Sequence, residues 1–168
     1  MAGLSIQDMA LTPAAERAAR FIRERHPEAV FTSGRRSIEK QAFVMASNAI
    51  RHGSAWLKDT YKNTRMVACL MTYMEENPEL CGSPVKLGRG FYEQLQEHFS
   101  DYFNKFAHVR GDAFDISWPR LGNGLIDRPR GEAICKTIET LPQHDIALEL
   151  LLRKEGSLDV IHAQFRST

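Results

Sequence analysis

The sequence has few cysteines, and their spacing is uninformative. Its 168 residues include Cys69, Cys81 and Cys135, an odd number with no Cys-x-x-Cys pair. Disulfide-framed secreted domains and thiolate zinc sites both need paired or closely spaced cysteines. Both are therefore excluded, and the three thiols are expected to be reduced. Any metal must be held by histidine and carboxylate side chains.

Long hydrophobic runs and an excess of one charge are also missing. No apolar run approaches the ~20 residues that span a membrane, so we expect no stable membrane insertion. Lys and Arg number 22 against 21 Asp and Glu, a net charge of +1. Nucleic-acid binding needs clustered basic residues, and none is expected here. The first residues lack the basic and apolar parts of a signal peptide, so we expect synthesis in the cytoplasm without one.

The elements that the sequence does contain predict an α+β fold in a single domain over residues 1–168. Apolar residues recur at helical spacing in residues 13–26, 37–52, 54–77, 90–105 and 131–141. Thr12 and Ser37 are expected to cap the first two helices. Short β-like runs cover residues 29–33, 113–118, 146–152 and 158–165, and Gly/Pro-rich loops cover 77–90 and 117–131. The last two strands are expected to form a hairpin through Gly156, giving a small antiparallel sheet flanked by helices.

Residues 108–115 carry the strongest chemical signal, because they read His-x-x-Gly-x-Ala-x-Asp. Imidazole and carboxylate donors suit Zn²⁺. Extended, this stretch would span ~23 Å, too far for two ligands of one ion. Gly111 can adopt a positive φ and so bring His108 and Asp115 together. The simpler interpretation, a histidine in a turn and an aspartate in a strand, has about equal weight on this segment alone.

A second histidine in the last strand could complete such a site. If that strand pairs with residues 113–118, His162 can meet His108 and Asp115, and a His₂-carboxylate set leaves one tetrahedral position for water. Asp159 is the nearest carboxylate in sequence and could act as a general base, provided that a bend at Gly156-Ser157 places it before the strand, since residues i and i+3 of a regular strand face opposite sides. Otherwise His162 is a half-buried sheet histidine and Asp159 a turn acid.

Two adjacent arginines follow the first predicted strand. A guanidinium at the end of a strand could bind a substrate carboxylate with two hydrogen bonds. Solvated surface arginines are the more common outcome for such pairs, so Arg35 and Arg36 alone do not decide the matter.

The order of these motifs along the chain resembles that of the zinc D-alanyl-D-alanine carboxypeptidase and L-alanyl-D-glutamate endopeptidase family, which includes many phage endolysins. The family's Ser-Gly-x-Arg-Ser motif, with Gln four residues on, corresponds to residues 33–37 and Gln41. Its His-x-x-Gly-x-Ala-x-Asp motif corresponds to residues 108–115, and its acid-x-x-His motif to Asp159 and His162. The resemblance covers roughly residues 30–165, and residues 41–61 also look like phage-encoded members.

The resemblance implies a zinc metallopeptidase of the DD-peptidase fold that cuts peptide stems of bacterial peptidoglycan, as a monomer encoded by a phage or prophage. By resemblance, Zn²⁺ would be bound by His108, Asp115 and His162, and Asp159 would be the catalytic base. Arg36 would hold a peptide carboxylate or polarise the scissile carbonyl, with Ser33 and Gln41 also contacting substrate. An enzyme without a signal peptide would reach the wall through a membrane pore, by lysis or by virion delivery.

Three departures from the family pattern leave alternatives open. Phe106 stands where many members have Ser, Asp159 where many have Glu, and Gln164 where several have a further His. A non-catalytic protein that binds wall peptide or metal, or a phage structural component, would tolerate these changes. The motifs also do not distinguish which peptide bond is cut.

Overall fold

The computed structural model describes residues 3–154 and 159–166 of the chain. It divides into two compact units, one made of residues 1–35 and 110–168 and the other of residues 36–109. Two compact units do not by themselves show whether either folds alone, so a single domain over the whole chain stays a prediction. The predicted turn through Gly156 lies outside the described residues.

The first unit contains a four-stranded antiparallel sheet. Its strands are β1 (Val30–Ser33), β2 (Ala113–Ser117), β3 (Leu148–Leu152) and β4 (Val160–Phe165), in the spatial order β1-β2-β4-β3. The predicted pairing of the last strand with residues 113–118 is confirmed, and Asp115 lies directly opposite His162. With the helices described below, this sheet confirms the α+β class.

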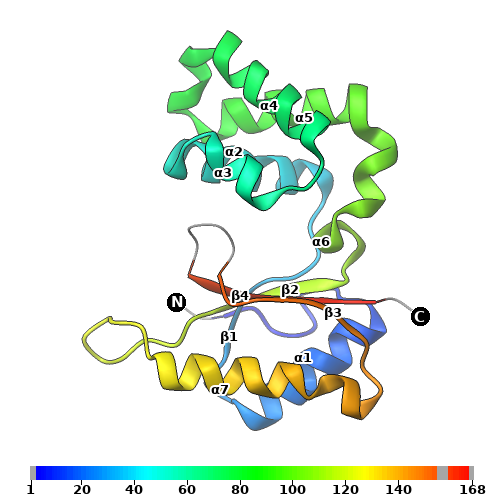
Figure 1. Cartoon of the computed structure of the whole chain (residues 1–168), viewed down its shortest axis with the longest axis vertical. Coiled ribbons are helices and arrows are strands. Elements are labelled where there is room, and N and C mark those ends of the chain that lie inside the picture. Colours follow the sequence, from blue (N-terminus) through cyan, green and yellow to red (C-terminus); the bar gives the residue numbers. More distant parts are fainter. Residues whose placement is uncertain (1–2, 155–158, 167–168) are drawn as a thin grey trace. The chain divides into compact units, whose positions relative to one another are not determined.

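Two helices, α1 (Pro13–Arg25) and α7 (Arg128–Glu139), cover one face of this sheet (Figure 1). Phe114, Ile116 and Ile161 point toward them and belong to the main hydrophobic core. Because side chains alternate along a strand, Asp115 and His162 point to the opposite face. The apolar face thus anchors the sheet, and the other face is left for polar side chains.

Cys135 of α7 lies inside this core, fully shielded from solvent. Burial raises the pKa of its thiol to about 11. Only the thiolate is a good metal ligand or nucleophile. This thiol therefore stays protonated near neutral pH, as expected for a cysteine with a packing role.

The second unit is helical. It contains α2 (Ile38–His52), α3 (Ala55–Thr60), α4 (Thr64–Glu76) and α5 (Pro84–Phe99), and ends in the single-turn α6 (Ala107–Arg110), which continues into the first unit. Two 3-10 segments, η1 (Pro78–Gly82) and η2 (Ser100–Lys105), flank α5. Helices α2 and α5 pack closely where Gly88 faces Phe43, since a Cβ on Gly88 would lie 2.9 Å from the Phe43 Cα.

Several predicted boundaries were wrong. The helix predicted over residues 54–77 is two helices, because the Asn63 side chain accepts a hydrogen bond from the Met66 amide and starts α4 afresh. Residues 77–90 are not a loop, because Pro78 and Pro84 fit the first positions of η1 and α5. Asp127 caps α7, which begins three residues earlier than predicted.

The predicted caps of the first two helices had different outcomes. Ser37 caps α2 by accepting from the Lys40 amide, as predicted. Thr12 does not cap α1, since within the described chain its hydroxyl donates to the carbonyl of Gly111 at 3.4 Å. The described helices include none long and apolar enough to cross a membrane.

Candidate metal centre

The turn that contains Gly111 brings His108 close to Asp115. His108 lies in the single turn α6, Gly111 follows with φ of +86°, and β2 begins two residues later. The Gly111 carbonyl accepts from the Thr12 amide at 3.0 Å, which holds the turn against the start of α1. Gly111 thus has the positive φ that the sequence predicts.

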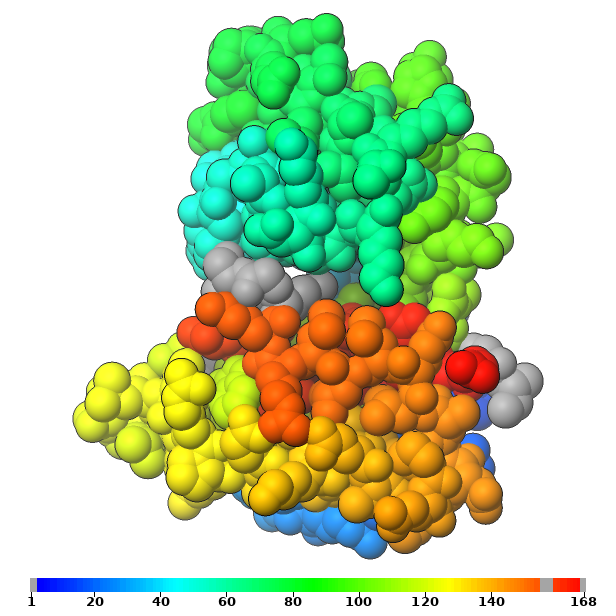
Figure 2. Space-filling model, viewed as in Figure 1, coloured from blue at the N-terminus to red at the C-terminus, as the bar shows by residue number. Residues whose placement is uncertain are grey.

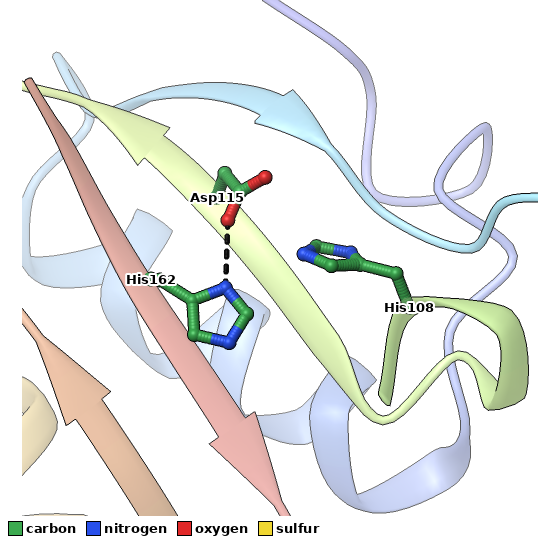
Figure 3. Close-up of side chains that lie close together, drawn as sticks. All are labelled: His108, Asp115 and His162. Carbon is green, nitrogen blue, oxygen red and sulfur yellow. Dashed lines mark hydrogen bonds and ion pairs between the residues drawn. The ribbon is translucent and has the colours of Figure 1, made fainter. Parts of the chain in front are cut away.

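The two strands β2 and β4 place the other two donors. Asp115 in β2 and His162 in β4 are paired across the sheet, and the His162 Nδ1 lies 2.9 Å from the Asp115 Oδ1. Figure 3 shows the His108 ring directed toward this pair. Donor atoms of the three residues all lie within 4.8 Å of one another. Residues far apart in the sequence thus converge on one point.

The three side chains are buried, with exposed fractions of 6% for His108, 4% for Asp115 and 6% for His162. Burying a carboxylate is costly unless a positive charge or hydrogen bonds compensate it. The other buried charged side chains are explained by their surroundings, since Asp112 pairs with Arg110 at 2.5 Å and Asp127 caps α7. The Asp115 carboxylate pairs with His162 at 2.9 Å, and a cation bound by Asp115 and the two imidazoles would add to this compensation.

The donor set fits a small divalent cation. Zinc binds imidazole nitrogen and carboxylate oxygen at ~2.0–2.2 Å, so its ligand atoms are ~3.4 Å apart in a tetrahedron. One donor atom from each of the three residues lies within 4.8 Å of the other two, which is near this separation. A metal and the proton shared by His162 and Asp115 compete for the same atoms, so metal affinity should fall in acid.

His108 is further positioned through its own backbone. Its carbonyl accepts a hydrogen bond of 3.0 Å from the amide of Arg36, which lies just before α2. The Arg36 guanidinium donates to the Gln41 Oε1 at 3.2 Å, and the Gln41 Nε2 donates to the Tyr61 hydroxyl at 3.0 Å. Arg36 and Gln41, both predicted to contact substrate, are thus joined in one chain of hydrogen bonds. Gln41 is 4% exposed, so it can orient Arg36.

Ser33 and Asp159 lie at or next to the ends of β1 and β4, the two strands that flank β2. Ser33 ends β1 and pairs in register with Asp115 after an irregularity in the strand. Asp159 immediately precedes β4 and is exposed. It is not one of the three clustered donors, so the general-base role remains a prediction.

Sequence reasoning placed Phe106 in the apolar register of the helix predicted over residues 90–105, and it missed Tyr61 as a site residue. The Tyr61 ring lies edge-on to Phe106, with centroids 6.1 Å apart, and to Trp56 at 5.7 Å. Phe106 also contacts Tyr102 at 5.5 Å and is 7% exposed. The departure from Ser at position 106 therefore has a local reason, the filling of an aromatic cluster.

Comparison with protein-family models, with curated proteins and with solved structures gives no match. A functional conclusion must therefore be argued from the three motifs and from the geometry of the metal-binding candidates.

Replacing Gly111 with alanine tests how much this turn contributes to zinc binding. A Cβ in the left-handed region costs about 1–2 kcal/mol, and here it would lie 3.1 Å from the Ala10 carbonyl oxygen. We expect lower stability and weaker zinc binding, measured by chemical denaturation with chelator and by calorimetric zinc titration.

Gly124→Ala is the matched control, because Gly124 has φ of +83° and open space around its Cβ position. It should lose stability and keep zinc affinity. Equal zinc affinities in the two variants would contradict a role for the Gly111 turn in metal binding.

Proposed function

We propose that the protein is a zinc-dependent peptidase that hydrolyses the peptide stems of bacterial peptidoglycan, with the fold of the zinc DD-peptidases. The observation that carries the proposal is the convergence of His108, Asp115 and His162, which come from two separate motifs of the chain, on one buried point. The Ser-Gly-x-Arg-Ser motif adds support, because the backbone amide of its Arg36 donates a hydrogen bond to the His108 carbonyl.

Each residue then has a defined task. His108, Asp115 and His162 would hold the ion, which when bound supplies a Lewis acid and lowers the pKa of a coordinated water toward neutrality. Asp159 would accept the proton of the attacking water and return it to the leaving amine. Arg36, oriented by Gln41, would bind a carboxylate of the peptide with two parallel hydrogen bonds.

The route by which the protein reaches the cell wall is part of the same proposal. A phage- or prophage-encoded monomer would reach the wall through a pore, by lysis or by virion delivery. Soluble peptidoglycan fragments bypass this requirement, so activity can be tested directly.

The test is mass spectrometry of muropeptides after incubation with purified protein. We expect cleaved stems with a new free amine, loss of cleavage on exhaustive chelation, and recovery on adding Zn²⁺. Turnover that survives complete removal of metal would rule out the mechanism. Zinc or peptide binding without any released amine would instead support a non-catalytic binding protein, and stable oligomers lacking both would support a structural component.

A further inference from the structure

Asp112 is a buried carboxylate beside the turn of the metal centre. It is 1% exposed, follows Gly111 directly and lies three residues before Asp115. A carboxylate is buried at such a depth only where a positive charge or hydrogen bonds compensate it. Asp112 is outside the three-residue donor cluster, so metal binding by itself gives this carboxylate no task.

The side chain of Asp112 reaches back across the turn. Its Oδ2 accepts a hydrogen bond of 2.5 Å from the Nε of Arg110, the last residue of α6. His108 lies two residues before Arg110 in the same single turn of helix. Hydrogen bonds between two charged groups are stronger than those between neutral ones. The pair therefore joins the two sides of Gly111 and holds the end of α6 against the start of β2.

The backbone of Asp112 makes a second contact, with β4. Its carbonyl accepts a hydrogen bond of 2.8 Å from the amide of Phe165, whose side chain is fully buried in the hydrophobic core. This bond continues the strand pairing that sets Asp115 opposite His162. Asp112 is thus tied both to the helical turn of His108 and to the strand of His162, the two segments that carry the imidazoles in Figure 3.

We propose that Asp112 is a positioning residue of the metal centre. Through Arg110 it fixes the turn of His108, and through the Phe165 amide it fixes that turn relative to β4. Preorganised groups bind more tightly, because less freedom is lost on binding. The effect of Asp112 on peptide hydrolysis rests on the proposed function, whereas its effect on the three donor side chains does not.

Two substitutions at position 112 measure the contribution of the side chain. Loss of a residue that orients a metal ligand costs ~10–100-fold in affinity, so we expect Asp112→Ala to bind zinc at least ~10-fold more weakly. Asp112→Asn keeps an oxygen that can accept from Arg110 and should recover part of this loss. Calorimetric zinc titration measures the affinities, and circular dichroism checks that both variants are folded.

Asp127→Ala is the matched control. Asp127 is another buried carboxylate paired with an arginine, since it is 7% exposed and lies 3.3 Å from the Nε of Arg130. It caps α7 at the end of the loop that is yellow in Figures 1 and 2. Its loss should lower stability and leave zinc affinity unchanged. Equal losses of zinc affinity in Asp112→Ala and Asp127→Ala would point to general destabilisation and overturn the positioning role.

Arg110→Gln tests the pairing from its other side. Alone it should weaken zinc binding, and combined with Asp112→Asn it should cost less than the sum of the two single losses, because both substitutions remove the same interaction. Strictly additive losses would mean that Asp112 does not act through Arg110, contrary to the proposal.

NMR of the zinc-free protein tests the positioning without metal or turnover. Asp112→Ala should shift the ring signals of both His108 and His162, although His162 is far away in the sequence. Asp127→Ala should shift neither. Unchanged ring signals in Asp112→Ala would refute the proposal even if the protein bound no zinc.

Hydrolysis of a stem peptide separates this proposal from the peptidase. At limiting zinc, Asp112→Asn should lower kcat/KM, and saturating zinc should restore it, because the same three donors hold the ion once it is bound. Weaker zinc binding by Asp112→Ala without hydrolysis by any variant would remove the peptidase and keep the positioning role. Hydrolysis and zinc affinity that are both unchanged in Asp112→Ala would remove the positioning role and keep the peptidase.

Discussion

Replacing His162 with alanine is expected to lower zinc affinity by more than ~100-fold and to abolish peptide hydrolysis. Loss of a partner that only orients a zinc ligand already costs ~10–100-fold in affinity, and here one of three donors is removed. The stabilisation by zinc, about 2.7 kcal/mol at a concentration 100 times Kd, should disappear with it. Zinc titration by calorimetry and thermal unfolding with and without zinc measure both effects.

The control for this substitution is His98→Ala. The His98 side chain is 44% exposed and lies outside the three-residue cluster. It should bind zinc as the unaltered protein does. If His162→Ala also kept its zinc affinity, the ion would be held elsewhere or not at all, and the metal centre proposed here would be wrong.

The second large effect is expected for Asp159→Asn. An amide cannot accept the proton of the attacking water, and general acid–base catalysis accounts for ~10²–10⁴ in rate. We expect kcat to fall at least ~100-fold, with zinc affinity unchanged because Asp159 is outside the cluster. Hydrolysis of a stem peptide and calorimetric zinc titration are measured on the same preparation.

Asp101→Asn provides a matched exposed carboxylate in η2 and should keep full activity. Asp159→Glu retains the carboxylate and should recover part of the rate. Near-normal turnover by Asp159→Asn would remove this residue from the role of base, while leaving the metal centre in place. The two substitutions, at positions 159 and 162, thus separate proton transfer from metal binding.

Local features of the sequence determined which groups could meet. The alternation of residues 113–118 separates Asp115 from the apolar side chains of Phe114 and Ile116, and Gly111 marks the reversal before the strand. Local signals failed where α4 begins, because the cap that Asn63 forms with the Met66 amide outweighs an apolar periodicity that runs through residues 54–77. Periodicity reports which face is buried, whereas a cap acts through one or two hydrogen bonds.

By itself the sequence predicted the α+β class, the antiparallel strands and the three candidate metal-binding residues that the structure brings together. Only the tertiary structure decided that β2 pairs with β4 in the register that sets Asp115 opposite His162, and that Gln41 joins Arg36 to Tyr61. Register depends on contacts between residues 47 positions apart. A shift by one residue would turn His162 to the other face of the sheet, so no local pattern can specify this meeting.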